Sequence, residues 1–288
     1  MRGSLTYPWK VVDYMEVLKP GATFLLTFIG GCAAVVAAGG EVSAGMLGLI
    51  LLTVALGSAG CNGLTNYLDR EVDARMLRTK HRALPSGRIK TPQKVLFLVS
   101  GLIAAGLVLA WFLHPLCFLA GAIGVVASAV WRKTVSCTFL GIVASCSPVL
   151  IGWFAVRPAF DFQILFLCLL VAVWVPIHVW SVMIANREDY LNAGLNYFPL
   201  SWSVRNVVKT LFILSLLLTL ISVLFYLIAG LHILYLIVAT VFGIVMVVAS
   251  ANLLFSTTPE SAWRLYKLSA YPYLGIIFLT MSLDAWLF

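Results

Sequence analysis

Two aspartates and a run of basic side chains mark the stretch from residue 62 to residue 88, NGLTNYLDREVDARMLRTKHRALPSGR. Asp69 and Asp73 are four residues apart at the end of an apolar segment, so on a helix they project from one face. Carboxylates placed in this way can share divalent cations, and Mg²⁺ prefers one or two carboxylates together with phosphate oxygens. The spacing therefore predicts a site for a diphosphate group that Mg²⁺ bridges to the protein.

The residues that follow the aspartates are strongly cationic. Eight lysines and arginines lie between Arg70 and Lys94, and acidic residues alternate with them at the start of the run. Cytoplasmic loops beside membrane spans are usually rich in basic residues, but this loop contains more of them than that tendency explains. A substrate that carries several negative charges fits both the carboxylate–metal half and the cationic half of the motif, because the basic side chains can hold the phosphates.

Two asparagines extend the same helical face into the apolar segment. Asn62, Asn66, Asp69 and Asp73 are separated by four, three and four residues, so all four lie along one stripe. Polar groups inside a membrane are costly unless they have partners, which makes them candidates for function. For the asparagines, a ladder of hydrogen bonds between helices is an equally good interpretation. For the aspartates the alternative is a solvated helix end, although two such carboxylates repel each other without a cation between them.

The composition places this motif in a membrane protein. Of the 288 residues, 62% are hydrophobic and 10% are charged, and the mean hydropathy is +1.02. A helix needs roughly 20 apolar residues to cross the hydrocarbon core. Nine segments approach this length, and the fourth is the shortest. They are residues 21–38, 44–67, 95–113, 116–131, 138–156, 164–185, 207–229, 233–255 and 268–287.

The basic residues predict the orientation of these spans. With the nine segments above, eighteen of the nineteen lysines and arginines fall on one side of the membrane and only Arg157 falls on the other. The positive-inside rule makes the crowded side cytoplasmic, so the N-terminus and the active-site loops are expected in the cytoplasm and Phe288 outside, in a cell (inner) membrane. The net charge of +8 thus belongs to a membrane-facing rim and gives no support to nucleic-acid binding.

We therefore expect an all-α membrane protein. Residues 1–19 form a cytoplasmic N-terminal arm without a cleavable signal, and residues 20–288 form a single transmembrane domain. The nine helices should pack as a bundle with a central cavity open to the cytoplasmic side, because the long, charged connections all fall on that side. A small transporter with nine helices is the alternative, but its ionisable groups belong at the midplane of broken helices, and here they gather at one end.

Four segments of the chain resemble the UbiA-type intramembrane prenyltransferases. They are NYLDREVDARMLRTKHRALPSGRI, LKPGATFLLTFIGG, VWRKTVSCTFLGIVASCSPVLIGW and WVPIHVWSVMIANREDYLNAGLNYFPL, which together span about residues 19 to 199. The resemblance is closest to the protoheme IX farnesyltransferase (heme O synthase) branch. The residues that carry it are Met76, Arg78, Thr79, Arg82, Pro176, His178, Asp189 and Tyr190.

This resemblance implies a UbiA-like bundle and a transferase that uses Mg²⁺. The implied reaction moves a farnesyl group from farnesyl diphosphate to a vinyl group of protoheme IX (heme B), and the product is heme O. A heme A synthase or a terminal oxidase is then expected as an assembly partner, beside the membrane lipid. The alternative within the same family is a prenyltransferase that acts on a quinone precursor, another tetrapyrrole or a lipid headgroup.

The site roles follow from the residues and the resemblance together. Asp69 and Asp73 are assigned to Mg²⁺, and Asn66 to orientation of the site. Asp189 is expected to complete a second metal site, although the chain lacks a second full DxxxD motif at this position. The diphosphate is expected to contact six basic residues, which are Arg78, Lys80, Arg82, Arg132, Lys133 and Arg187.

His178 has two interpretations. It lies in an apolar segment two residues after Pro176, which frees a backbone carbonyl and can kink the helix. A neutral imidazole there can ligate heme iron or position the macrocycle. A buried histidine that is hydrogen-bonded to a neighbouring helix accounts for the residue equally well.

Overall fold

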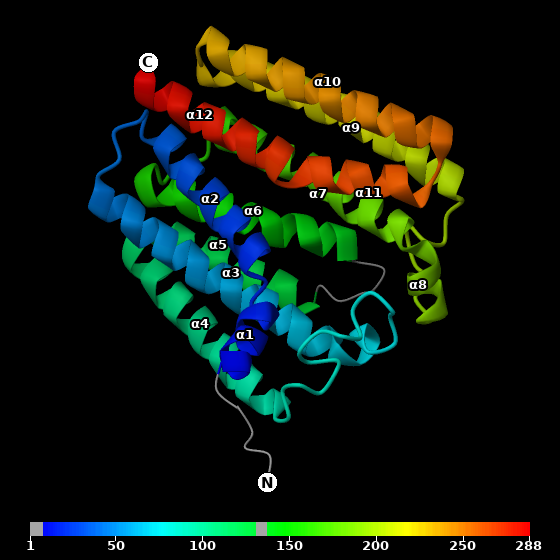
Figure 1. Ribbon diagram of the computed structural model, residues 1–288. Coiled ribbons are helices and arrows are strands. Elements are labelled where there is room, and N and C mark those ends of the chain that lie inside the picture. Colours follow the sequence, from blue (N-terminus) through cyan, green and yellow to red (C-terminus); the bar gives the residue numbers. More distant parts are fainter. Residues whose placement is uncertain (1–7, 131–136) are drawn as a thin grey trace.

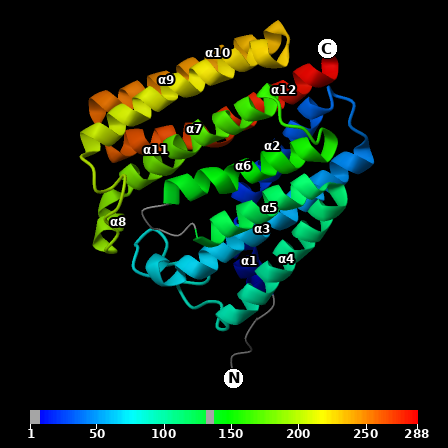
Figure 2. The same ribbon diagram turned by 180° about the vertical axis from the view of Figure 1, so that it is seen from behind.

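The computed structural model describes residues 8–130 and 137–288, and in these residues it contains helices and no strands. Figures 1 and 2 show most of the long helices running side by side as one bundle, with the short helices α1 and α8 near the same end of it. The elements are α1 Pro8–Val17, α2 Pro20–Ala37, α3 Ala44–Asp73, α4 Pro92–Leu113, α5 Pro115–Val130, α6 Cys137–Val156, α7 Phe162–Ala185, α8 Arg187–Asn192, α9 Val204–Ala229, α10 Ile233–Ser256, α11 Pro259–Leu268, η1 Ser269–Gly275 and α12 Ile276–Leu287.

The described residues include eight helices that are long and apolar enough to cross a membrane, and α5 is a shorter apolar helix at the fourth predicted span. The last of the eight runs from Pro259 to Leu287 and comprises α11, η1 and α12, with a kink at η1. The predicted class, an all-helical integral membrane protein, is confirmed.

Two predicted boundaries differ from the structure for identifiable reasons. The second span continues to Asp73, six residues past its predicted end, because helix α3 carries the polar motif out of the apolar region. The last span begins nine residues early, at Pro259, where a capping box between Thr258 and Ser261 starts the helix. Its first turns contain charged residues, so hydropathy alone did not include them.

Close contacts between backbones hold the N-terminal helices together. Helix α2 packs against α3, α6 and α12, and α3 packs against α4. At the crossing of α2 and α6, a side chain on Gly152 would lie 1.9 Å from the carbonyl oxygen of Gly30, so only glycine fits there. At the crossing of α3 and α4, a side chain on Gly106 would lie 2.9 Å from the amide nitrogen of Gly57. The rigid wall formed by α2, α3, α4 and α6 positions the polar end of α3.

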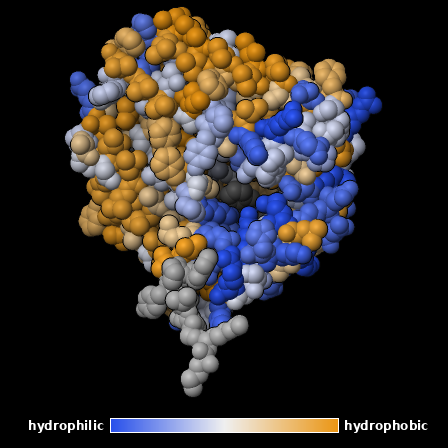
Figure 3. Space-filling view, viewed as in Figure 1, coloured by the Kyte–Doolittle hydropathy of each residue, from blue (hydrophilic) through white to orange (hydrophobic). Residues whose placement is uncertain are grey.

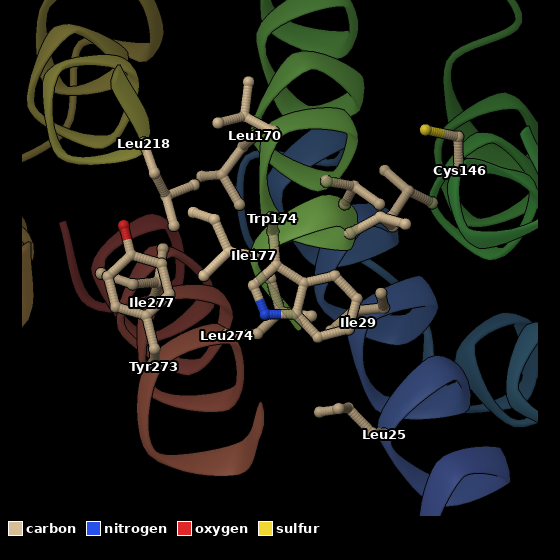
Figure 4. Close-up of a cluster of buried hydrophobic side chains, with 14 of the residues drawn as sticks. Leu25, Ile29, Cys146, Leu170, Trp174, Ile177, Leu218, Tyr273, Leu274 and Ile277 are labelled. Carbon is tan, nitrogen blue, oxygen red and sulfur yellow. The ribbon is translucent and has the colours of Figure 1, made fainter. Parts of the chain in front are cut away.

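Helix α7 lies in the middle of the apolar core. Figure 4 shows Trp174 and Ile177 of α7 among side chains from α2, α6, α9 and the last span, including Ile29, Leu218 and Tyr273. Ile29 and Ile177 are fully buried. Burial of this kind stabilises the bundle by dispersion contacts, which replace the hydrophobic driving force within a lipid environment.

A kink in the last span locks that span to α7. The backbone of Ala270 leaves helical geometry, with ψ at −119°, and Pro272 follows two residues later. The carbonyl oxygen of Ser269 accepts a hydrogen bond from the indole Nε1 of Trp174, and the Ser269 hydroxyl lies 2.9 Å from Nδ1 of His178. The kink therefore supplies polar partners to two α7 side chains that would otherwise be unsatisfied in an apolar core.

Candidate active site

The polar end of α3 contains a buried ion pair. Asp73 is only 2% exposed, and its carboxylate lies 3.3 Å from a guanidinium nitrogen of Arg82. The hydroxyl of Thr79 donates a hydrogen bond to the Asp73 backbone carbonyl. Residues 74–91, which we call the basic loop, therefore fold back over the end of α3 and bring a guanidinium to the second aspartate. A carboxylate this deeply buried needs such a partner to stay charged.

A cavity of about 300 Å³ opens beside this ion pair, and we call it the mouth cavity. Figure 3 shows hydrophilic residues gathered on one side of the molecule, while hydrophobic residues cover most of the rest of that view. The residues that line the cavity come from α2 or its cap, α3, the basic loop, α6, α7, α8, the turn after α8, and α11. They are Lys19, Asn62, Thr65, Asn66, Asp69, Asp73, Arg78, Arg82, Cys137, His178, Val179, Val182, Met183, Tyr190, Tyr197 and Tyr266.

The structure brings six of the eleven predicted site residues into this one cavity. They are Asn66, Asp69, Asp73, Arg78, Arg82 and His178. Arg132 and Lys133 lie outside the described residues. Lys80, Arg187 and Asp189 are described but do not line the mouth cavity. The lining thus combines carboxylates and guanidinium groups with the apolar α7 side chains Val179, Val182 and Met183, which suits a molecule with an anionic head and an apolar body.

Asp189 holds the basic loop in place. One of its carboxylate oxygens accepts a hydrogen bond of 2.6 Å from the backbone N–H of Leu77, and the other accepts one of 3.0 Å from the N–H of Arg78. Both oxygens are therefore engaged by the loop on which Arg78 sits. This contact gives Asp189 a positioning role that spacing did not suggest, and its predicted role as a metal ligand remains a prediction.

Arg187 and Lys80 were expected to contact the diphosphate, but neither lines the mouth cavity. A guanidinium nitrogen of Arg187 donates to the carbonyl oxygen of Leu200, so the side chain ties α8 to the turn that follows it. Lys80 is exposed on the outside of the basic loop. The expected diphosphate contacts of both residues remain predictions.

The two asparagines bond to neighbouring segments and also line the mouth cavity. The amide nitrogen of Asn66 donates to the carbonyl oxygen of Val17 at the end of α1, and that of Asn62 donates to the hydroxyl of Thr23 in α2. The two asparagines therefore connect elements and also line the mouth cavity, and the role of Asn66 in orienting the site remains a prediction. The hydrogen bond of Asn66 therefore connects the N-terminal arm to the polar end of α3.

The arm is fixed by charge as well. The guanidinium of Arg88 in the basic loop forms ion pairs with Asp13 and Glu16 of α1. Val17 of α1 is buried in a small apolar cluster with Ala83, Leu84 and residues of α4. Helix α1, the basic loop and the end of α3 therefore form one packed unit beside the mouth cavity.

Two buried tyrosines complete the polar wall. A guanidinium nitrogen of Arg78 lies 3.4 Å from the hydroxyl of Tyr190, and the Arg78 guanidinium carbon lies 6.0 Å from the centre of that ring. Burial raises the pKa of Tyr190, and the positive charge of Arg78 only partly opposes this. Burial also raises the pKa of Tyr197. Both phenols are therefore neutral at physiological pH and can donate hydrogen bonds to an anion in the cavity.

His178 is held by a hydrogen bond to a neighbouring helix and lines the mouth cavity, and its contact with heme remains a prediction. Its ring lies between Trp174 and Tyr266, with centroid separations of 4.8 Å and 4.4 Å, and Nδ1 is bonded to the Ser269 hydroxyl. It is thus a histidine hydrogen-bonded to a neighbouring helix, and it also lines the mouth cavity. The stacking and the hydrogen bond fix the orientation of the ring.

Several cavity residues were missing from the predicted site, above all Lys19 and Tyr266. Lys19 caps α2 in the left-handed region, with φ at +49°, an uncommon conformation for a residue with a side chain. A cation at a helix N-terminus opposes the helix dipole, and this sequence feature could have drawn attention to it. Tyr266 lies on α11, in the turns that the predicted last span left out. Thr65 lies four residues before Asp69, so helical spacing could have identified it.

The contact between Asp189 and the basic loop can be tested by proteolysis. In Asp189→Asn the new amide group would face a backbone N–H, so one of the two hydrogen bonds is lost and the loop loosens. We expect trypsin to cleave between residues 75 and 80 several-fold faster than in the parent, as mapped by mass spectrometry. Glu188→Gln, one residue away and exposed, serves as the control and should cleave at the parental rate. Equal cleavage in all three proteins would contradict the positioning role.

Comparison with known proteins agrees with this geometry. The model of the UbiA prenyltransferase family matches residues 24–273. A protoheme IX farnesyltransferase of Desulforudis audaxviator is 35% identical over 95% of this chain and 88% of its own length. Another from Symbiobacterium thermophilum is 34% identical, over 95% of this chain and 94% of its own length.

Solved structures share the fold at lower identity. A structure of digeranylgeranylglyceryl phosphate synthase is 20% identical, covers 97% of this chain and 100% of its own, and has a TM-score of 0.77. A UbiA homologue from Archaeoglobus fulgidus, bound to GPP and Mg²⁺, is 16% identical, covers 94% and 99% of the two chains, and has a TM-score of 0.67. Family, fold and cavity agree: the chain belongs to the UbiA prenyltransferase family and is an integral membrane prenyltransferase.

Proposed function

We propose that this prenyltransferase transfers a farnesyl group from farnesyl diphosphate to a vinyl group of protoheme IX, and that the product is heme O. The observation that carries the proposal is the gathering of Asp69, Asp73, Arg78 and Arg82 around one cavity whose other wall is apolar. The acceptor is inferred from the relatives, since those cited above at 34% and 35% identity carry the name protoheme IX farnesyltransferase.

The donor set of the mouth cavity fits Mg²⁺ held jointly with a diphosphate. The described residues contain no group of three or more histidine, cysteine or acidic side chains that could hold a metal by themselves. Asp69 and Asp73 do share the cavity, and Mg²⁺ in sites of this kind takes one or two carboxylates, phosphate oxygens and water. When bound, Mg²⁺ would neutralise charge that develops on the departing diphosphate.

The chain's own residues bind and orient the reacting groups. Arg78 and Arg82 attract the diphosphate, and the neutral hydroxyl of Tyr190 donates to it. The carbon–oxygen bond at C1 of the farnesyl group breaks and the electron pair leaves with the diphosphate. The vinyl double bond of protoheme forms the new carbon–carbon bond to C1, and water then adds to the adjacent carbon and loses a proton. The apolar wall from α7 shields the allylic cation from water before that bond forms.

We assign the acceptor side of the cavity to α7. His178 lies there in a fixed orientation, and Tyr266 and Trp174 stack on its two faces. A neutral imidazole is a common axial ligand of heme iron, so His178 is the side chain that we expect to contact the macrocycle. The distribution of basic residues supports a cytoplasmic position for the cavity edge, the basic loop and α1. A heme A synthase or a terminal oxidase is the expected downstream partner.

Product identification tests the proposal directly. The purified protein, incubated with Mg²⁺, farnesyl diphosphate and ferrous protoheme, should release diphosphate and form a heme whose mass has increased by one farnesyl group and one hydroxyl group. Formation of a prenylated quinone precursor or lipid headgroup, with protoheme left unchanged, would instead support the alternative acceptor classes of the family. Inorganic diphosphate release without a new heme would contradict the proposed acceptor.

The two aspartates should be essential for turnover. In Asp69→Asn or Asp73→Asn the side chain keeps its size but loses the charge that holds the cation, so we expect the rate of diphosphate release to fall by about a hundredfold or more. Yield of Asp69→Asn from the membrane should change little, whereas Asp73→Asn also loses its buried ion pair with Arg82, so rates are compared per amount of folded protein. Glu71→Gln is the matched control, because Glu71 lies between the two aspartates with 83% of its side chain exposed. If either aspartate variant kept the parental rate of diphosphate release, the metal role of that aspartate would be contradicted.

His178→Ala should weaken protoheme binding more than farnesyl diphosphate binding, since the imidazole faces the acceptor side. Protoheme titration followed by the Soret absorbance measures the first affinity, and calorimetry with Mg²⁺ and farnesyl diphosphate measures the second. We expect a loss of about tenfold or more for protoheme, which corresponds to one ligand–protein contact. His81→Ala, in the exposed part of the basic loop, should leave both affinities unchanged. Equal protoheme affinity in His178→Ala and the parent would return His178 to a purely structural role.

A further inference from the structure

A groove on the outer surface of the bundle runs between α10 and the last span. It measures about 320 Å³, and it shares no lining residue with the mouth cavity. Helix α10 ends at Ser256 and α11 begins at Pro259, so the chain reverses at Thr257 and Thr258 and the two helices run antiparallel (Figure 1). We call this space the outer groove. One of its ends lies near this turn.

The end of the outer groove near the turn is polar. Asn252 lies four residues before the end of α10, and Arg264 lies five residues after the start of α11. With a rise of about 1.5 Å per residue, both positions are therefore about 6 to 8 Å from the turn. Both side chains are exposed. A guanidinium and an amide thus border the groove at the same depth.

The rest of the outer groove is apolar. On α10, Val248 and Ile244 follow Asn252 at intervals of four residues, and on α11 Leu268 follows Arg264 at the same interval, so each set lies along one helical face. Val248 and Ile244 are 61% and 55% exposed. From Asn252 to Ile244 the groove extends about 12 Å along the helix. This length approaches one leaflet, which is half of the roughly 30 Å hydrocarbon core.

Arg264 has no acidic partner in the part of the chain that the structure describes. Glu260, the only acidic residue of α11, forms no ion pair with it. The other basic residue of this helix, Lys267, lies with Nζ 5.8 Å from the centre of the Trp263 ring and does not line the groove. The positive-inside rule explains why Arg264 lies at this end of the bundle, but it does not explain its position at the polar end of an apolar groove. The guanidinium is therefore available to an anionic group.

The outer groove and the mouth cavity lie on opposite faces of α11. Arg264 borders the groove, whereas Tyr266 lines the mouth cavity and stacks on His178. Two residues along a helix with 3.6 residues per turn are about 200° apart. A molecule in the groove is thus separated from the candidate active site by the width of one helix, so the groove is not an extension of that site.

We propose that the outer groove binds one anionic glycerophospholipid, with its phosphate against Arg264 and Asn252 and an acyl chain along Val248 and Ile244. The guanidinium fork of arginine matches phosphate oxygens, and basic pockets between membrane helices on the cytoplasmic side suit anionic lipid headgroups. The acyl chain needs no polar partner and gains dispersion contacts along the groove. The lipid does not react, so this inference is independent of the proposed function.

Native mass spectrometry of the full chain in detergent tests the headgroup contact. The probes are phosphatidylglycerol and phosphatidylcholine with identical acyl chains. We expect the parent to bind the first phosphatidylglycerol at least about tenfold more tightly than phosphatidylcholine. Arg264→Gln should lose this preference, because glutamine keeps a hydrogen-bond donor but carries no charge.

Lys267→Gln is the matched control for the headgroup contact. It removes an exposed basic side chain of the same helix that does not line the groove, so the preference for phosphatidylglycerol should persist. Equal affinity of the parent for the two lipids, or a preference that survives in Arg264→Gln, would overturn the proposal. An equal loss of preference in both variants would show a general effect of surface charge and would overturn it as well.

Val245→Trp tests the acyl-chain half of the site and leaves the polar end intact. Val245 lines the groove and is 40% exposed, so a larger side chain fills the groove without entering the core. We expect its affinity for phosphatidylglycerol to fall by about tenfold. Val241→Trp is the control, because Val241 lies one turn away on the same helix, is 51% exposed and does not line the groove. Equal affinities in the two tryptophan variants would contradict the proposed chain path.

A measurement on the unaltered chain covers the case in which the variants do not fold. Phosphatidylglycerol with a diazirine in one acyl chain should crosslink to residues 244–252 and 261–268, as mapped by mass spectrometry. Excess unlabelled phosphatidylglycerol should suppress these crosslinks more than the same amount of phosphatidylcholine. Crosslinks spread evenly over the lipid-facing helices, or equal suppression by both lipids, would identify ordinary surrounding lipid and overturn the proposal.

Discussion

The pairing of buried charge at one end of an apolar bundle is the constraint on which the rest of the structure depends. In a chain with 10% charged residues, a carboxylate that is 2% exposed survives only with partners. Asp73 has Arg82, and Asp189 has two backbone N–H groups of the basic loop. Each contact that satisfies a carboxylate also folds the loop over the end of α3. The site is therefore organised by the protein before any ligand enters.

Helix α7 and the last span bring aromatic side chains with fixed orientations to the same cavity. At the kink in the last span, Ser269 forms hydrogen bonds with both Trp174 and His178, and Tyr266 stacks on the histidine ring. Helix α7 is thereby fixed in the core while one of its faces borders the cavity. Under the proposed function, this arrangement would separate the diphosphate leaving group from the acceptor.

Helical spacing was informative where the chain is helical and uninformative in loops. The stripe through Asn66, Asp69 and Asp73 was predicted from helical spacings of three and four residues, and the structure places all three in one cavity. The same reasoning could not separate Arg82 from Lys80, because Asp189, more than a hundred residues away, fixes the loop backbone that decides which side chain turns inward. Hydropathy located the spans but excluded the charged turns of α11, and with them Tyr266. Arg132 and Lys133 lie outside the described residues.

A structure determined with Mn²⁺ in place of Mg²⁺ and with farnesyl thiolodiphosphate tests the central claim most directly, because anomalous scattering locates the cation independently of the protein. The account predicts the cation between the diphosphate oxygens and the carboxylates of Asp69 and Asp73, with Arg78 and Arg82 against the same diphosphate. A diphosphate bound elsewhere, or a mouth cavity whose carboxylates contact no cation at saturating ligand, would contradict it.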